Sequence, residues 1–556
     1  MTSQTEQKAQ RVHIELQRVQ TWLFAVPRLK AMVGANAMLG TVLRESLPKL
    51  AKTPDKAWKL QGCPDSGSYG KKADDDPLQA EDDPATDAKA GILARDGGHF
   101  EADFASGAEE FAKEASALLE RKLPGLRFSV AVNKQRIERN GASLSYELPV
   151  LAPCEWSGRG LASALVEQGS GKDKETYSVS LDAQNRHEAA RQAARDKSAG
   201  GAGIDPDGKS GETAKDLASL LLQKTALGQL VLAEDFDKLT DEDYLAVIHA
   251  DGNGVGLAAR EKSGDSEPEK EARKAQFFHR NRVLLRRALK YAMDQAAERA
   301  EAAEVAPLTV LMLGGDDVLV VCRASLALSF VVDLCQELEK IQADVPKDAF
   351  RLTLGVGVVF SRPSVPFHRL HEVAEKLASS AKRLYRGMDK ANRASVVDWA
   401  SYTTAWADDP AEVRARDWVR GSGEDQRVLS RRPLRVVGKE LASLDGLIQR
   451  AKKLKDASRS QLHYLVETLS QGKTLAELAF EELSPATKRA LEEKDVGVNE
   501  VWSKQEGEPF LTSILDLVEV LEIPRLGVKN KRGTQAESHA TAGADTQKEA
   551  VHEQAQ

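Results

Sequence analysis

Short apolar runs alternate with longer amphipathic stretches through the second half of this chain. Runs rich in β-branched residues predict buried strands at 244–251, 308–313, 318–322, 351–360 and 395–399. Stretches with apolar residues at helical spacing predict helices at about 271–304, 325–342 and 367–386. The resulting βαββαβ order is that of a ferredoxin-like domain, whose central strands lie side by side.

The same order of elements recurs nearer the N-terminus. Strands are predicted at 12–16 and 127–132, helices at 29–39 and 107–123, and a hairpin with a Gly97-Gly98 turn at 91–104. This is an internal repeat at the scale of a whole domain. The sequence therefore predicts an α+β protein with two ferredoxin-like domains.

Composition shifts divide the chain further. The predicted units are a first α+β domain at 1–150, an insertion and linker at 151–225, a second α+β domain at 226–402, a helical domain at 403–525 and a disordered tail at 526–556. Residues 64–90 are acidic and interrupted by prolines, which predicts a mobile loop inside the first domain. The glycine-rich stretch 198–211 predicts a flexible linker.

Charge and cysteine content restrict the classes of function. The net charge of −7 argues against a bulk electrostatic grip on a nucleic-acid duplex, so such contacts must be local or shared with partners. The chain has four cysteines without paired spacing, which indicates neither a disulfide framework nor a zinc site. Without an apolar leader or an 18-residue apolar run, we expect a cytoplasmic protein with no membrane contact.

The candidate chemistry lies in Gly314-Gly315-Asp316-Asp317, at the turn of the second domain's hairpin. Glycines at such a turn tolerate positive φ and let a ligand approach the backbone. Adjacent carboxylates repel each other unless a cation lies between them. Most isolated tetrapeptides of this kind are solvated turns, so the surrounding order of elements carries most of the weight.

A second acidic turn follows the strand at 244–250. It reads Asp251-Gly252-Asn253-Gly254-Val255-Gly256. Because neighbouring central strands would bring Asp251 close to Asp316 and Asp317, the three carboxylates predict a hard oxygen site for Mg²⁺ or Mn²⁺. Such a site is typical of nucleotidyl transfer.

These motifs resemble the palm domain of nucleotidyl cyclases and polymerases, and more specifically the large polymerase/cyclase subunit of type III CRISPR effector complexes. The resemblance covers most of residues 11–525. Residues 251–256 are similar to the turn that precedes the family's Gly-Gly-Asp-Asp hairpin. Ala374-Glu375 with Ala381-Lys382, and Asn392-Arg393, are also family-like.

The resemblance implies an enzyme that makes cyclic oligoadenylate from ATP when target RNA binds. Two Mg²⁺ or Mn²⁺ ions would be held by Asp251, Asp316 and Asp317. The nucleotide would be contacted by Gly252, Asn253, Gly254, Gly314, Gly315, Lys382 and Arg393. Implied partners are the small subunit, the backbone and guide-end subunits, guide RNA and target RNA.

Several positions depart from the family pattern. His99 and Phe100 replace the aspartates of the first palm, which is then a scaffold. Only Cys154 remains where the family often has paired Cys-x-x-Cys knuckles, so zinc is not expected. The chain starts at the first palm and contains no His-Asp dipeptide, so we expect no DNA cleavage by this subunit.

Other readings stay open. A stand-alone dinucleotide cyclase and a non-catalytic scaffold are the alternatives, and selectivity for ATP over GTP does not follow from sequence. The basic residues of 280–290 and 431–439 fit either a salt-bridged surface or a contact with triphosphate, RNA or a neighbouring subunit. His249 shares a strand face with Asp251, but a hard oxygen site has little use for imidazole, so we expect it in the core or behind the site.

Overall fold

The computed structural model describes most of the chain. The described residues are 9–63, 66–69, 75–136, 153–158, 160–168, 175–198, 216–240, 243–261, 267–300, 303–346, 349–402, 409–454, 456–492, 498–504 and 506–525. The tail predicted at 526–556 and nearly all of the linker predicted at 198–211 lie outside them. The structure is a mixed α and β protein, roughly half helical, with several sheets.

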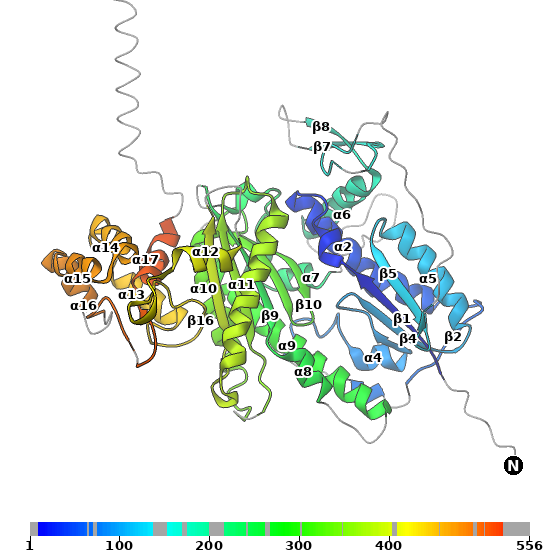
Figure 1. Cartoon of the computed structure of the whole chain (residues 1–556). Helices are drawn as coiled ribbons and strands as arrows, with labels where there is room; N and C mark the ends of the chain where they lie inside the picture. The colour runs from blue at the N-terminus through cyan, green and yellow to red at the C-terminus, as the bar shows by residue number, and fades with distance from the viewer. Residues whose placement is uncertain are drawn as a thin grey trace, which may run out of the picture.

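A six-stranded sheet forms the centre of the molecule (Figure 1). Its strands are β9 (Leu245–Gly252), β10 (Leu308–Gly314), β11 (Asp317–Arg323), β12 (Leu354–Ser361), β13 (Val396–Tyr402) and β16 (Leu434–Arg435). They lie in the order β10-β11-β9-β12-β13-β16. The strand β9 is therefore flanked by the hairpin strand β11 and by β12, and its mostly apolar sequence fits a strand buried on both faces.

Helices and neighbouring units cover both faces of this sheet. The helices of the unit are α8 (Val255–Arg260), α9 (Glu267–Arg299), α10 (Ala324–Lys340) and α11 (Phe367–Gly387). Alternate residues of β9 belong to different cores: Ala246 packs with α9, α10 and the C-terminal helices, and Val247 packs with α11 and the N-terminal unit. The central sheet thus links the two ends of the molecule, which lie on opposite sides of it (Figure 1).

The N-terminal unit is built around a second sheet. Its strands are β1 (Gln10–Gln17), β2 (Lys59–Leu60), β3 (Ile92–Ala94), β4 (His99–Ser106), β5 (Arg127–Val132) and β6 (Gln135–Arg136). Its helices are α1 (Val19–Leu23), α2 (Leu29–Thr41), α3 (Leu47–Ala51), α4 (Pro84–Lys89) and α5 (Ala108–Lys122). The strand β1 lies between β4 and β5, both antiparallel to it.

The remaining elements lie in the insertion and at the C-terminal end. The insertion contains β7 (Ala164–Gln168), β8 (Glu175–Val179) and α6 (Leu181–Ser198), followed by α7 (Leu217–Gln223). The C-terminal elements are α12 (Pro410–Asp417), β14 (Val419–Arg420), β15 (Arg427–Val428), α13 (Leu444–Lys453), α14 (Arg459–Gln471), α15 (Lys473–Glu481), α16 (Pro485–Glu492), β17 (Phe510–Leu511) and α17 (Ile514–Glu522). Cys154 is buried beside Trp156 in the insertion, and the absence of zinc there stays a prediction.

The acidic segment predicted as a mobile loop is, in its described part, docked onto α9. The carboxylates of Asp76 and Asp82 lie 3.1 and 2.7 Å from the guanidinium of Arg286, and all three side chains are buried. Burial raises the pKa of Asp82, but the charges of nearby arginines, Arg282 and Arg286 foremost, outweigh it and hold that pKa below its usual range. The prediction of mobility is wrong for this part, because buried ion pairs require fixed partners.

Basic residues of both predicted segments pair with acidic residues of the same chain. On α9, Arg286 is buried in an ion pair with Asp76, whereas Arg287 forms a partly exposed ion pair with Asp75, as a salt-bridged surface predicts. Arg432 is buried between two tryptophans and pairs with Asp516 at 2.9 Å and with Glu519 at 2.7 Å. It is therefore a structural link within the chain and not an RNA contact.

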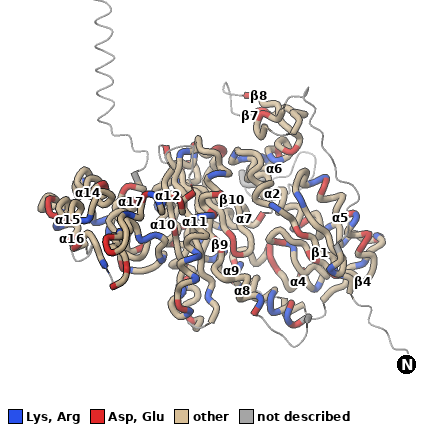
Figure 2. Tube along the Cα trace, in the orientation of Figure 1, with Lys and Arg blue, Asp and Glu red and all other residues tan. Residues whose placement is uncertain are grey.

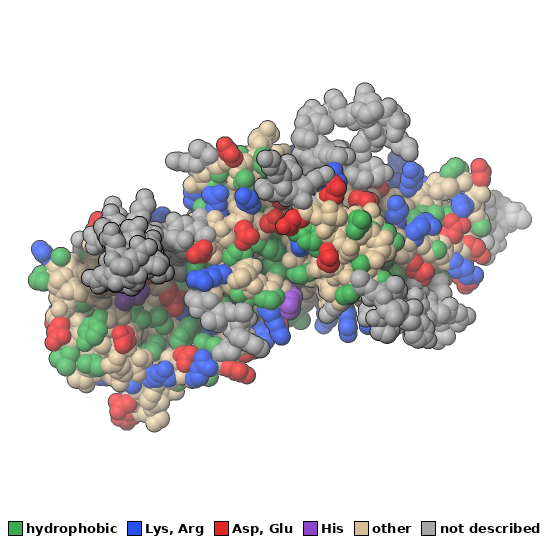
Figure 3. Space-filling view, turned by 90° about the horizontal axis from the view of Figure 1, so that it is seen from above, with side chains coloured by type: hydrophobic (Ala, Val, Ile, Leu, Met, Phe, Trp, Pro, Cys, Tyr) green, Lys and Arg blue, Asp and Glu red, His purple; other side chains and the backbone are tan. Residues whose placement is uncertain are grey.

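Surface charge is mixed in sign. Lys and Arg alternate with Asp and Glu along the whole described trace (Figure 2), and the face seen from above shows both kinds interspersed with apolar side chains (Figure 3). No described helix combines the length and apolar character needed to cross a bilayer.

Candidate metal and nucleotide site

The three aspartates predicted to converge are brought together by strand pairing. On β9, Asp251 lies directly opposite Asp317 of β11 on one side and Gly355 of β12 on the other. The Gly252 amide donates a hydrogen bond to the Asp316 carbonyl at 3.2 Å, which joins the two acidic turns. The arrangement follows from β9 being the central neighbour of the hairpin.

The electrostatics of this group call for a cation. Burial and the charge of Asp251 raise the pKa of Asp317 to about 8 and that of Asp316 to about 6. The buried Oδ1 atom of Asp317 has no hydrogen-bond partner among the described residues. Three carboxylates crowded in this way fit divalent Mg²⁺ or Mn²⁺, for which oxygen ligands are preferred, because bound positive charge removes their mutual repulsion.

Lys382 is the cation that the structure places in this group. It lies on α11, and its ammonium forms an ion pair with Asp251. Its aliphatic stem passes over Gly355, where an added Cβ atom would lie 2.5 Å from Lys382 Cγ. A glycine is therefore required at this position of β12 for the lysine to reach the carboxylates.

Asn253 fixes the turn after Asp251 with both its backbone and its side chain. The backbone N–H of Asn253 donates a hydrogen bond to the Thr353 carbonyl at 2.8 Å. The side-chain Nδ2 of Asn253 donates to Thr353 Oγ1 at 3.1 Å. Asn253 is buried, and Gly254 follows with φ of 69°, a conformation that favours glycine. The helix α8 begins at the next residue, so the turn leads the chain away from the carboxylates.

A pocket of about 660 Å³ opens beside this turn. Asp251, Asp316 and Lys382 line it, together with residues 252–254 of the turn. The predicted residues Asp317, Gly314 and Gly315 do not line it, and an added Cβ on either glycine would meet nothing within 4 Å. The hairpin glycines thus lie at an open edge of the site.

Lys382 and Arg393 of the pocket wall were predicted from the sequence. The other basic and aromatic residues of the wall were not. They are Arg260, Phe350, Arg351, Tyr385, Arg386 and Lys390. Helical spacing could have pointed to Tyr385 and Arg386, which follow Lys382 by three and four residues and so share its face of α11. Arg393 lies over the Tyr385 ring, 4.9 Å from its centre.

Two histidines lie behind the carboxylates on the α11 side of the sheet. His249 is buried as predicted, with its ring 5.5 Å from that of His371. Burial lowers the pKa of both, that of His371 to about 3 with help from the nearby His249, so both imidazoles are neutral at neutral pH. Sequence reasoning did not connect His371 with this region.

The sequence matches a known family in this part of the chain. Residues 244–391 match the family model for Cas10/Cmr2, second palm domain. The match spans β9 to α11 and contains all three aspartates and Lys382. It confirms the resemblance to a Cas10-type large subunit that the motifs indicated. No curated protein matches the chain.

Among solved structures, similar chains come from Csm1–Csm4 cassettes. The apo cassette matches with a TM-score of 0.40 at 13% identity, covering 94% of this chain and 70% of that chain. A cassette with AMPPNP gives 0.42 at 12% identity, covering 95% and 71%. A cassette with cA4 gives 0.39 at 12% identity, covering 93% and 70%. Likeness at this level is no evidence of activity.

Proposed function

We propose that this chain, whose residues 244–391 form a Cas10/Cmr2 second palm domain, synthesises cyclic oligoadenylate from ATP as the large subunit of a type III CRISPR effector complex. The observation that carries the proposal is the convergence of Asp251, Asp316 and Asp317 at the edge of a basic pocket. A nucleotide triphosphate is the ligand that combines metal-bound phosphates with a base and sugar large enough for such a pocket.

The carboxylates would hold the divalent cations. Asp251 and Asp317 lie opposite each other on adjacent strands, and Asp316 borders the pocket from the turn between β10 and β11. Bound Mg²⁺ or Mn²⁺ supplies charge that lowers the pKa of a 3′-hydroxyl and neutralises a triphosphate. The chain's own part is to keep three carboxylates in one place despite their repulsion, through the pairing of β9 with β11.

The basic wall would bind and orient the phosphates. Lys382 is already beside Asp251, so it can contact a phosphate placed there with little movement. Arg351, Arg386 and Lys390 line the same pocket. Charges placed beforehand around a phosphoryl group stabilise the charge that develops during transfer.

The N-terminal unit would act as a scaffold for this site. Two ferredoxin-like palms are supported by the similar strand order around β1 and β9. At the hairpin position of the first unit, Phe100 is buried in the core and His99 lies with its ring 5.7 Å from that of His13. Neither offers a carboxylate, so only the second palm is proposed to carry out transfer.

The partners follow from the same proposal. They are the small, backbone and guide-end subunits of the effector complex, guide RNA and target RNA. Another of the similar solved structures is a Csm1–Csm4 subcomplex of the type III-A CRISPR-Csm interference complex. For this chain, activity is expected to depend on target RNA bound by the assembled complex.

The test is Asp317→Asn in the reconstituted complex. Because the substitution removes a metal ligand and little packing, conversion of labelled ATP in Mg²⁺ or Mn²⁺ should fall by at least about a hundredfold. The matched control Asp55→Asn, at an exposed turn of the first unit, should leave the rate unchanged. If Asp317→Asn keeps a near-parent rate, the assignment of the metal site is wrong.

A further inference from the structure

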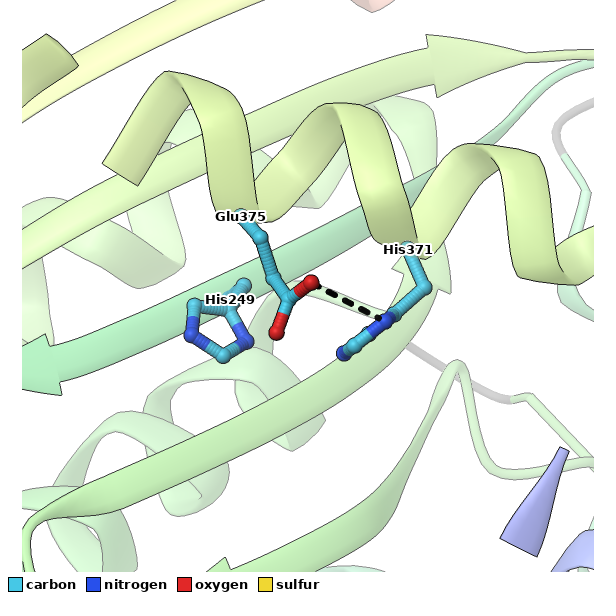
Figure 4. A group of neighbouring side chains, drawn as sticks. All are labelled: His249, His371 and Glu375. Atoms are coloured by element: carbon cyan, nitrogen blue, oxygen red, sulfur yellow. Dashed lines mark ion pairs between the residues drawn. The ribbon is translucent and has the colours of Figure 1, made fainter. Parts of the chain in front are cut away.

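A group of two histidines and one glutamate joins α11 to the central sheet (Figure 4). His249 comes from β9, and His371 and Glu375 are one helical turn apart on α11. One ligand atom from each residue can be chosen so that all three lie within 4.8 Å of one another. In Figure 4 the Glu375 carboxylate points between the two rings.

The histidines lack hydrogen bonds that their burial calls for. Both are only 5% exposed, and neither Nδ1 of His249 nor Nε2 of His371 has a hydrogen-bond partner among the described residues. The other ring nitrogen of His371 lies 3.8 Å from Glu375, beyond hydrogen-bond distance. A buried polar atom left without a partner costs about 1–3 kcal/mol, so two in one cluster point to a missing ligand.

His371 is flanked on one side by apolar aromatic rings. Its ring lies 4.8 Å from that of Phe24 and 6.5 Å from that of Phe367, both apolar. On the other side, Glu375 is 42% exposed at its side chain, so the cluster is open to solvent through the carboxylate. The cluster thus has aromatic rings on one side and a solvent-exposed carboxylate on the other.

We propose that His249, His371 and Glu375 form a second metal site, for a borderline transition-metal ion such as Zn²⁺. Two imidazoles with one carboxylate are a donor set that Zn²⁺ prefers, whereas the three aspartates offer only the oxygen ligands that suit Mg²⁺. The two sites therefore differ in the ion that they select. This inference does not depend on the proposed nucleotide chemistry.

The geometry needs only a small adjustment. Donor atoms on a tetrahedral Zn²⁺ ion with bonds of about 2.0–2.2 Å lie about 3.3–3.6 Å apart. The three ligand atoms now lie within 4.8 Å of one another, and His371 Nδ1 is 3.8 Å from the Glu375 carboxylate, so small shifts of the three side chains would bring them to that spacing. Water from the open side would complete the coordination.

An ion at this site would cross-link α11 to β9. Its ligands come from both elements, close to the contact of α11 with the N-terminal unit through Phe24. The same strand carries Asp251 and the same helix carries Lys382, so the cross-link would hold the two partners of that ion pair in register. The ligands thus have a positioning role toward the candidate site.

The experiment uses the full chain with every affinity tag removed and with excess Mg²⁺ present. Zn²⁺ binding is measured by isothermal titration calorimetry, Co²⁺ binding by its visible absorption bands, and melting temperature with and without Zn²⁺. The variants are His371→Leu and the fold-preserving Glu375→Gln. The controls are His279→Leu, an equally buried histidine on α9, and Asp317→Asn.

We expect one equivalent of Zn²⁺ in the parent, tetrahedral Co²⁺ bands, and a higher melting temperature with Zn²⁺. Affinity should fall at least about tenfold in Glu375→Gln and more in His371→Leu, and the control variants should bind as the parent does. A parent that binds no Zn²⁺ would overturn the proposal. So would binding that survives both ligand substitutions, or that is lost in Asp317→Asn.

Discussion

Gly252 is the position where a single methyl group tests the geometry of the candidate site. It lies between Asp251 and Asn253, and its amide is bonded to the hairpin at Asp316. A Cβ atom at this position would lie 2.6 Å from Asp316 Oδ2, 2.8 Å from Asp316 Cβ and 2.6 Å from Val255 Cγ2. The Gly252→Ala substitution therefore displaces a proposed ligand without changing any charge.

The size of the effect follows from these distances. Nonbonded carbon atoms are at their best separation at about 3.5–4.0 Å, so Asp316 must move by about 1 Å to make room. A misplacement of that size at a catalytic site costs about a hundredfold in rate. The accompanying overpacking should lower the free energy of unfolding by about 1–3 kcal/mol.

The assay compares Gly252→Ala with Gly387→Ala in the reconstituted complex. Gly387 ends α11, and an added Cβ there meets nothing within 4 Å. Labelled ATP is converted in Mg²⁺ below the melting temperature of both variants, which is measured first. Near-parent turnover by folded Gly252→Ala would refute the placement of Asp316 at the reacting centre.

Two other predictions concern charge. Lys382→Gln should lower kcat/KM for ATP by about a hundredfold while the complex still assembles, because a phosphate-binding charge is lost; unchanged kinetics would remove Lys382 from the site. Asp82→Asn should lower the free energy of unfolding at pH 7 by about 3–5 kcal/mol, and the exposed Asp75→Asn by about 1 kcal/mol or less. Because the pKa of Asp82 is depressed in the folded protein, its stabilisation is complete above about pH 4 and lost as pH falls through the folded pKa, so parent and Asp82→Asn should converge in acid. Urea unfolding across that pH range measures this, and a constant gap would contradict it.

Much of the central sheet could be predicted because its signals are local. Strand and helix periodicity are properties of short segments, and the predicted hairpin at 308–322 appears as β10 and β11. The pairing of Asp251 with Asp317 then follows from the order of elements, without any knowledge of side-chain packing. The basic pocket wall was only partly foreseen, since Arg351 reaches it from the segment before β12 and Lys390 from the connection between α11 and β13.

The failures involve partners far apart in sequence. From sequence, the acidic, proline-broken segment resembles a mobile loop. In the structure, Arg286, about 200 residues away, supplies the opposite charge that fixes it. From sequence, Arg432 likewise resembles a surface cation. In the structure it is buried against Asp516 and two tryptophans. His371 had no local pattern that linked it to His249, because the two meet only when α11 packs on β9.

The most direct test of the central claim is product analysis with ATP and GTP supplied separately. The lone protein and the reconstituted complex are each incubated with and without target RNA complementary to the guide, and the products are identified by mass spectrometry. The account predicts cyclic oligoadenylate from ATP only in the complex with target RNA, and little product from the lone chain. Robust cyclic dinucleotide made from GTP by the lone protein would contradict it.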